Sequence, residues 1–324
     1  MTARDIGKLA AAGQVPRGPV GIASTSRAAI QEVICLLARD DVGVSHVFGP
    51  SRQVKKEEEE GLVLLAGLRA LQVDPATSVI IIASRPTSPS VITPVLAGVA
   101  RSNKPVIACL LGSEPRQVWR SGAIPAARLD EAAMRAAAWV RGWDQALVSS
   151  GLEDQDEQLA AMAAKLRSQL GPARSQVRAL LTDEILCHEA QVMFSDLAKR
   201  LDSPGLGSAL TARVQLNPAL WRRDLRHALA DRQIAVILLH LALGDAQFVD
   251  PIGALIAVVG DHRHSKPPAG DGAQDEPWII AQVCSPGRDP KEMASQQARL
   301  WNADVILATS NAAAARLAGL IVRK

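Results

Sequence analysis

Along the first half of the chain, short apolar blocks alternate with longer blocks in which hydrophobic and polar positions are mixed. The short blocks are apolar runs rich in Val and Ile, at residues 18–23, 43–48, 78–83 and 105–111. Such runs are typical of strands buried on both faces of a parallel sheet. The longer blocks between them have the length of helices, at residues 28–39, 57–71 and 90–102. This alternation predicts an α/β domain with a doubly wound parallel sheet.

The second half of the chain repeats this plan. Its predicted strands lie near residues 177–181, 234–241, 277–284 and 304–308, and its predicted helices near 184–200, 218–231, 290–301 and 311–321. The strand, turn and helix that begin at Pro19 have a counterpart that begins at Val177. A repeat at a spacing of roughly 155 residues far exceeds the period of solenoid repeats, so it indicates a duplicated domain.

The boundary between the two domains is expected near Ser149-Ser150-Gly151, which we interpret as the link between helices at 130–143 and 153–170. The resulting division is an N-terminal extension at 1–15, a first domain at 16–145, a helical linker at 146–176 and a second domain at 177–324. Within the second domain, Gly260–Pro277 has the composition of an exposed loop.

Composition excludes several classes of function. The net charge of +3 arises from 36 basic and 33 acidic residues, which is too balanced for a nucleic-acid-binding protein. No apolar stretch reaches the roughly 18 residues of a membrane span, and the N-terminus lacks the pattern of a signal peptide. The cysteines, which do not show metal-site spacing, are expected to be reduced and buried in a cytoplasmic protein: Cys35, Cys109, Cys187 and Cys284.

Anion-binding turns are expected after the strands, because ligands of open α/β sheets lie at the carboxyl ends of the strands. Such turns normally carry glycine where the backbone must touch phosphate oxygens. Here the turn after the first strand reads Ser26-Arg27-Ala28-Ala29, and its counterpart reads Thr182-Asp183-Glu184. Asp183 and Glu184 would repel an anion, and we interpret Ser26 as a helix N-cap.

Other polar motifs have structural explanations. Asp250 and Asp289 each precede proline and are expected to cap a helix. His188-Glu189 lacks a second histidine at helical spacing and is interpreted as part of a helix surface. Asp261, His262 and His264 lack a further ligand nearby, so we expect no metal site. No cofactor is expected either.

Several stretches resemble the FdrA proteins, relatives of the α subunit of succinyl-CoA synthetase and of other NDP-forming acyl-CoA ligases. The resemblance runs from about residue 16 to the C-terminus, and its matching stretches include residues 43–49, 84–86, 104–106, 186–190, 250–251, 288–290 and 310–318. It implies two tandem flavodoxin-like, succinyl-CoA synthetase-like domains without the CoA-binding-like domain that precedes them in the family. The implied family activity is a carbamoyl transfer of the oxamate carbamoyltransferase type, and the wider superfamily ligates acyl groups to CoA through a phosphohistidine.

The chain departs from the family at the turns that would bind phosphate. The glycine turns are replaced at Ser26–Ala29, Ser51–Lys56 and Asp183–Ile185, and Arg120 stands where the ligases have the histidine that is phosphorylated. The strand-end aspartate of the second domain is replaced by His240. The remaining candidates for anion or ligand binding are Ser26, Arg27, Arg52, Arg85, Asp250, Asp289, Ser310 and Asn311; the catalytic residues are unknown.

Apolar strands combined with altered turns lead to the hypothesis of a degenerate, non-catalytic FdrA-like subunit in a carbamoyltransferase-type complex. Its partner would be an FdrA-type or carbamoyltransferase subunit, and a homo-oligomer is also compatible. One alternative is a divergent carbamoyl- or acyltransferase in which Arg27, Arg52 and Arg85 bind the anion, because arginine binds carboxylate and phosphate through paired hydrogen bonds. Another alternative is a sensor of a small molecule.

Overall fold

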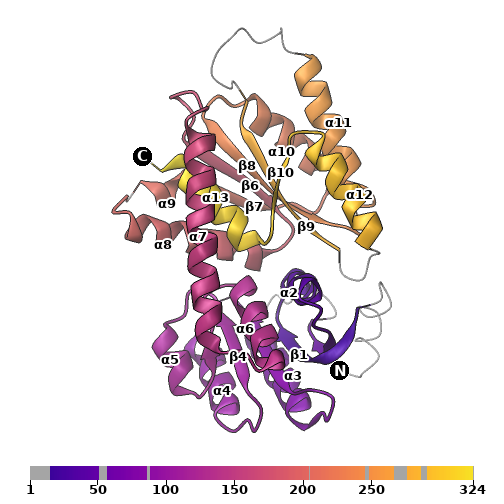
Figure 1. The fold of residues 1–324 in the computed structure, drawn as a ribbon, viewed down its shortest axis with the longest axis vertical. Helices are drawn as coiled ribbons and strands as arrows, with labels where there is room; N and C mark the ends of the chain where they lie inside the picture. The colour runs from indigo at the N-terminus through magenta and orange to yellow at the C-terminus, as the bar shows by residue number, and fades with distance from the viewer. Residues whose placement is uncertain are drawn as a thin grey trace. The chain divides into compact units, whose positions relative to one another are not determined.

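The computed structural model describes residues 15–50, 57–85, 88–203, 205–244, 248–265, 276–285 and 290–323 (Figure 1). The chain forms two compact units that divide between Glu153 and Asp154. We refer to the described residues up to Glu153 as the first unit and to those from Asp154 as the second unit.

The first unit is built on a five-stranded parallel sheet of order β2-β1-β3-β4-β5. Its strands are β1 (Arg17–Ser24), β2 (Val44–Phe48), β3 (Val79–Ser84), β4 (Val106–Leu110) and β5 (Ile124–Pro125). Its helices are α2 (Arg27–Arg39), α3 (Glu57–Val73), α4 (Pro89–Val99), α5 (Pro115–Arg120) and α6 (Leu129–Arg141). Helices α2 and α6 pack together, and α3 and α4 bury a separate apolar cluster against β3 and β4.

The second unit repeats this topology, with a parallel sheet of order β10-β9-β8-β6-β7. Its strands are β6 (Gln176–Leu181), β7 (Leu210–Val214), β8 (Ile234–Ala242), β9 (Trp278–Cys284) and β10 (Ile306–Ala308). Its helices are α8 (Glu184–Arg200), α9 (Leu206–Ala209), α10 (Pro218–Ala230), α11 (Pro251–His264), α12 (Pro290–Trp301) and α13 (Asn311–Val322). Helices α8 and α13 cover one face of this sheet, and α10, α11 and α12 lie on the other (Figure 1).

Both units place the first strand of the unit between its second and third strands, as flavodoxin-like sheets do. The predicted fold class, two tandem doubly wound α/β domains, is therefore confirmed. The central strands are buried along nearly their whole length: β3 and β4 carry only buried residues, and β8 is exposed in part only at its end.

Two glycines allow β1 and β2 to approach closely at their beginnings. A Cβ atom added to Gly43 would lie 2.4 Å from the carbonyl carbon of Arg17, and one added to Gly18 would lie 2.5 Å from the Cα atom of Gly43. The ladder between the two strands is irregular over this stretch. Only residues without a side chain fit between the two backbones there.

The predicted break at Ser149-Ser150-Gly151 is wrong. A single helix, α7 (Gln145–Arg167), runs through these three residues. The two serines are exposed and Val148, just before them, is buried, so the helix keeps an apolar contact at this point. A glycine inside a helix costs only about 1 kcal/mol relative to alanine, which one such contact offsets.

The exposed loop predicted at Gly260–Pro277 is wrong for its first part, because α11 continues to His264. The imidazole of His264 bonds to the carbonyl of Gly260 within this last turn, at 2.7 Å. Arg263 pairs with Glu276 at 3.2 Å and with Asp304 at 2.9 Å. These contacts hold residues whose composition is typical of a loop in helical conformation.

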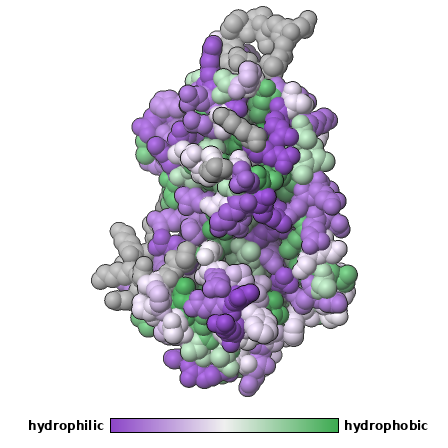
Figure 2. Space-filling view, turned by 90° about the vertical axis from the view of Figure 1, so that its left-hand side faces the viewer, coloured by the Kyte–Doolittle hydropathy of each residue, from purple (hydrophilic) through white to green (hydrophobic). Residues whose placement is uncertain are grey.

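The outer surface of the described chain is mixed in character. None of its helices is long and apolar enough to cross a membrane. On the face shown in Figure 2, hydrophobic residues are scattered among hydrophilic ones.

Candidate functional site at the carboxyl edges of the sheets

The turn between β1 and α2 is closed by its own serine side chains. The hydroxyl of Ser26 caps α2 and accepts a hydrogen bond from the amide of Ala29, at 3.1 Å. The amide of Ser26 in turn donates to the hydroxyl of Ser24, also at 3.1 Å, and both serines are buried. The predicted N-cap is confirmed. Two amides that could have contacted an anion are thus already paired with side chains.

The equivalent turn between β6 and α8 is closed by a carboxylate. Asp183 caps α8, and its Oδ1 atom accepts a hydrogen bond from the amide of Ile185 at 2.9 Å. Glu184 follows at the first helical position and is exposed. The N-terminus of a helix favours negative charge, and here the protein itself supplies that charge.

The pKa of the Cys187 thiol differs from what its position in the helix predicts. A cysteine in the first turn of a helix normally has a lowered pKa, because the helix dipole stabilises the thiolate. In α8 the pKa of Cys187 is raised to about 12, first by burial and then by the charges of Asp183 and Glu184. Asp183 and Glu184 thus add negative charge at the beginning of α8, and burial of the thiol is the larger cause of the shift.

Each unit also joins the turn after its first strand to the adjacent central strand. In the first unit, the hydroxyl of Thr25 lies 3.1 Å from that of Ser84. In the second unit, the hydroxyl of Thr182 lies 2.7 Å from Nδ1 of His240. His240 is 2% exposed, and burial lowers its pKa to about 4, so the imidazole is neutral near pH 7.

A small cavity adjoins His240. The centre of a water molecule can occupy about 20 Å³ of it. The total empty space, which includes part of the open solvent, is about 360 Å³. The described residues that line it are Thr182, Gln215, Leu216, Trp221, His240, Leu241, Ala242, Phe248 and Pro251. Among the described residues, Nε2 of His240 has no hydrogen-bond partner.

The arginines that sequence analysis proposed for anion binding have different surroundings. Arg85 forms an ion pair with Glu60, whose carboxylate is buried, at 3.2 Å. Arg27 is exposed at the first position of α2. Arg52 lies outside the described residues, as does Asp289. Part of the positive charge of Arg85 is therefore used within the protein.

The other candidate residues lie in the second unit. Asp250 caps α11, with Oδ1 accepting from the amide of Gly253 at 2.8 Å, and Pro251 occupies the first turn, as predicted. Ser310 caps α13 and accepts from the amide of Ala313 at 2.9 Å. All of these helix beginnings follow strand ends, so the candidate residues of this unit share the carboxyl edge of its sheet.

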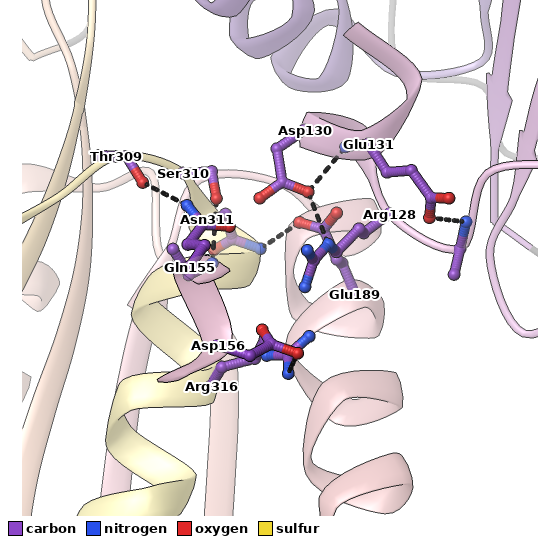
Figure 3. Close-up of polar contacts among 12 residues, drawn as sticks. Arg128, Asp130, Glu131, Gln155, Asp156, Glu189, Thr309, Ser310, Asn311 and Arg316 are labelled. Carbon is purple, nitrogen blue, oxygen red and sulfur yellow. Dashed lines mark hydrogen bonds and ion pairs between the residues drawn. The ribbon is translucent and has the colours of Figure 1, made fainter. Parts of the chain in front are cut away.

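Asn311 makes a buried contact that places Glu189 inside the protein. Its Nδ2 atom donates to Oε2 of Glu189 at 2.7 Å and to the carbonyl of Leu186 at 3.1 Å. Figure 3 shows Asn311, at the start of α13, directed toward Glu189 on α8. Glu189 is 0% exposed, so the interpretation of His188-Glu189 as a helix surface is wrong for the glutamate. A buried carboxylate needs such donors to offset the loss of hydration.

Sequence reasoning missed a related carboxylate in the first unit. Glu32 is also 0% exposed, and it lies six residues beyond the N-cap Ser26, as Glu189 lies six residues beyond Asp183. The spacing carried a signal for Glu189, because it lies three positions after the buried Leu186 and four positions before the buried Met193. These offsets place it on the apolar face of the helix.

Within the described residues, no group of three or more His, Cys, Asp or Glu side chains is arranged to hold a metal ion. Cys109, Cys187 and Cys284 are buried thiols and Cys35 is half-buried. Arg120, which the family resemblance aligns with a histidine of the ligases, is the last residue of α5 and is exposed.

Comparison with known proteins relates part of this chain to CoA ligases. Residues 202–321 match the family model described as CoA-ligase. The chain therefore contains a CoA-ligase-like segment. The uncharacterized protein YahF of Escherichia coli (strain K12) is 25% identical over 335 residues, covering 92% of this chain and 61% of YahF. The chain thus spans about three fifths of the length of that relative.

Two solved structures match most of this chain at low similarity. PH0766 from Pyrococcus horikoshii OT3 is 14% identical with a TM-score of 0.32, and the match covers 95% of this chain and 65% of that one. The dinucleotide forming acetyl-coenzyme A synthetase 1 of Ca. Korarchaeum cryptofilum is 13% identical with a TM-score of 0.32, over the same shares of the two chains.

Proposed function

We propose that this chain is a non-catalytic, FdrA-like subunit of a carbamoyltransferase-type complex. Its CoA-ligase-like fold would support an active FdrA-type or carbamoyltransferase partner in the cytoplasm by completing the site or the quaternary shape of that partner. The match of residues 202–321 to the CoA-ligase model supports the general class, and the finer assignment rests on the family resemblance together with the closed turns.

The Asp183 cap is the observation that carries this proposal. A phosphate or carboxylate that approached the start of α8 would have to displace the Asp183 carboxylate from the amide of Ile185. It would also meet Glu184, and the same two charges contribute to the high pKa of Cys187. An anion held at a helix N-terminus needs free amides and positive potential, so this turn is poorly suited to bind one.

The rival function is that of a divergent transferase that binds its anion through arginines. The ion pair between Arg85 and Glu60 weakens this alternative, because the carboxylate already neutralises part of the guanidinium charge. The turn at Ser24–Ser26 has no acidic residue, and Arg27 follows it directly. The first unit is therefore more suitable for such a site than the second unit.

A steady-state assay of the isolated full chain with oxalurate and inorganic phosphate tests the proposal. We expect no carbamoyl phosphate above the uncatalysed background, and turnover by the chain alone would overturn the subunit role. Affinity purification of the tagged chain from its native cells, followed by mass measurement, provides the second test. We expect a transferase-type chain in stable stoichiometry, and recovery of the chain alone would contradict the proposal.

A further inference from the structure

Helix α10 exposes basic side chains on the side that faces away from the core. Exposed residues at spacings of three and four form one stripe along it: Ala219, Arg222, Arg223, Arg226, His227 and Ala230. Arg223 pairs with Asp224 at 3.0 Å, whereas Arg222 and Arg226 form no ion pair with any described residue. Like charges one helical turn apart repel each other, so this arrangement weakens the helix by itself. Both guanidinium groups are thus able to bind a carboxylate from outside the chain.

Helix α7 carries an exposed stripe of the opposite charge. The residues of this stripe are Ser150, Glu153, Asp154, Glu157 and Ala161. None of its three acids forms an ion pair with a described residue, whereas Asp156, which lies beside them, pairs with Arg316 of α13. No lysine, arginine or histidine occurs in the sequence from Gln145 to Ala164. The negative charge of this stripe is therefore not neutralised along its own helix.

The α7 and α10 stripes match position by position. On each helix, an exposed small residue is followed after three, four and seven positions by three residues of one charge, and after eleven positions by an exposed alanine. Arginine binds carboxylates through paired hydrogen bonds. Small side chains at both ends allow the two backbones to approach, because the distance between packed helices depends on the side chains at the contact. The stripes are thus complementary in charge and in spacing.

Within the second unit, the two stripes lie on different sides of the sheet. The part of α7 that belongs to this unit is held against α13, where Asp156 pairs with Arg316 and Arg167 donates to the carbonyl of Leu320 at 3.4 Å. Helix α10 covers the other face of the sheet (Figure 1). A contact between the stripes therefore joins two copies of the chain.

We propose that the α10 stripe of one copy docks on the α7 stripe of a second copy, with the three arginines opposite the three carboxylates. Because the stripes lie on different faces, the contact is head to tail, and each copy keeps one stripe for a further copy. This inference does not rest on the proposed subunit role, because it concerns contacts between copies of this chain alone.

Other partners fit α10 less well. A basic helix that binds a lipid surface inserts its apolar face, but the apolar face of α10 is buried in the core through Trp221, Leu225 and Leu229. Proteins that bind single-stranded nucleic acid stack the bases on exposed aromatic rings. The tryptophan of α10, Trp221, is only 2% exposed and offers no such platform.

The contact is expected to be weak and sensitive to salt. A single pair of helices offers less area than the roughly 800 Å² per partner of a standard interface, and its charges are exposed. Sedimentation equilibrium of the full chain at about 20 mM salt should show self-association with a Kd on the order of 100 μM. At about 300 mM salt, the Kd should be at least about tenfold higher, because the ions screen the charges.

Charge reversal tests which residues form the contact. Arg222→Glu with Arg226→Glu reverses the α10 stripe, and Glu153→Arg with Glu157→Arg reverses the α7 stripe. Each double variant alone should remain monomeric where wild type associates, because its two stripes then have the same sign. An equimolar mixture of the two variants should associate again. All four substitutions in one chain, which keep the net charge of wild type, should also restore self-association.

A matched control separates this contact from a general effect of charge. Arg116→Glu with Arg120→Glu reverses two exposed arginines at the same spacing on α5 and should leave the association unchanged. Wild type that stays monomeric at low salt overturns the inference without any variant, as does wild type that instead binds duplex DNA or anionic vesicles through α10. Equal loss in the control, or a mixture of the two α7 and α10 variants that does not associate, also overturns it.

Discussion

Thr182 and His240 join the end of β6 to the end of β8 through a hydrogen bond of 2.7 Å. Thr25 and Ser84 occupy corresponding places in the first unit, at 3.1 Å. Both threonines directly precede the N-cap of a helix, Ser26 or Asp183. The two units thus share the threonine and differ in its partner, and only the second unit buries a titratable ring at this position.

The buried imidazole makes stability depend on pH. The folded pKa of His240, about 4, lies below the ordinary value of 6.5, so the unfolded chain binds the proton more readily between these values. The contribution of the neutral imidazole to the free energy of unfolding is fully present above pH 6.5. It is lost as pH falls toward 4, with a total of about 3 kcal/mol. Urea denaturation at a series of pH values should show a steeper loss for wild type than for His240→Gln. Parallel curves would contradict the prediction.

The thiol of Cys187 should be unusually unreactive. Its pKa of about 12 leaves almost no thiolate near pH 8, whereas Cys35 is only half-buried. We expect iodoacetamide to label Cys35 well before Cys187, as followed by peptide mass spectrometry. Asp183→Asn should speed labelling of Cys187 only slightly, because burial is the larger cause of the shift. Labelling in urea provides the control, since unfolding should make the two rates similar.

Asn311 should be important for the stability of the second unit. Asn311→Ala removes a donor from the buried Glu189 carboxylate and is expected to cost about 2–4 kcal/mol. Asn302→Ala, at an exposed asparagine, should cost less than about 0.5 kcal/mol. Calorimetric unfolding of the full chain measures both changes.

A charge-removing background separates the carboxylate from simple packing. In Glu189→Gln, the further change Asn311→Ala should cost clearly less than it does in wild type, because no buried charge then loses a donor. Equal costs in the two backgrounds would show that the charge of Glu189 is not what Asn311 stabilises.

The close approach of β1 and β2 predicts a specific sensitivity. Gly43→Ala would place a methyl group 2.4 Å from the carbonyl carbon of Arg17 and is expected to destabilise the first unit by several kcal/mol, on the order of the largest point-mutant effects. Gly171→Ala meets nothing within 4 Å and should be close to neutral. Thermal unfolding compares the two variants, and equal melting temperatures would mean that the strands separate easily at this point.

Opening the turn at α8 should create an anion site. Asp183→Gly removes the carboxylate and costs only a few tenths of a kcal/mol as a cap, according to typical N-cap preferences. Sulfate, compared with chloride at equal ionic strength, should raise the melting temperature of this variant but not that of wild type. Asp183→Ser keeps a cap without the charge and should respond less than the glycine variant. Stabilisation of wild type by sulfate would contradict the closed-turn interpretation.

Much of the fold follows from the sequence because the central strands are buried on both faces. The continuous apolar run near Val79–Ala83 leaves little choice but a central strand. Strand β7, Leu210–Val214, was not predicted, because it lies at the edge of its sheet and alternates half-buried with exposed residues. An edge strand of five residues with one threonine and one arginine on its exposed positions lacks that continuous run.

The candidate site was less predictable, since it depends on contacts between distant residues. The cap at Ser26 follows from local sequence alone, because an N-cap bonds to an amide three residues later. Glu189 bonds to Asn311, 122 positions along the chain, and His240 bonds to Thr182, 58 positions away. A sequence shows which residues are polar, but their burial and partners are decided by tertiary packing.

The bond between Glu189 and Asn311 can form only late in the synthesis of the second unit. A stretch of 122 residues separates the glutamate from its asparagine. At a translation rate of about 5–20 residues per second, the ribosome takes roughly 6–24 s to add that stretch. During this interval the apolar face of the nascent helix has no α13 to pack against, so we expect it to stay exposed until α13 is made.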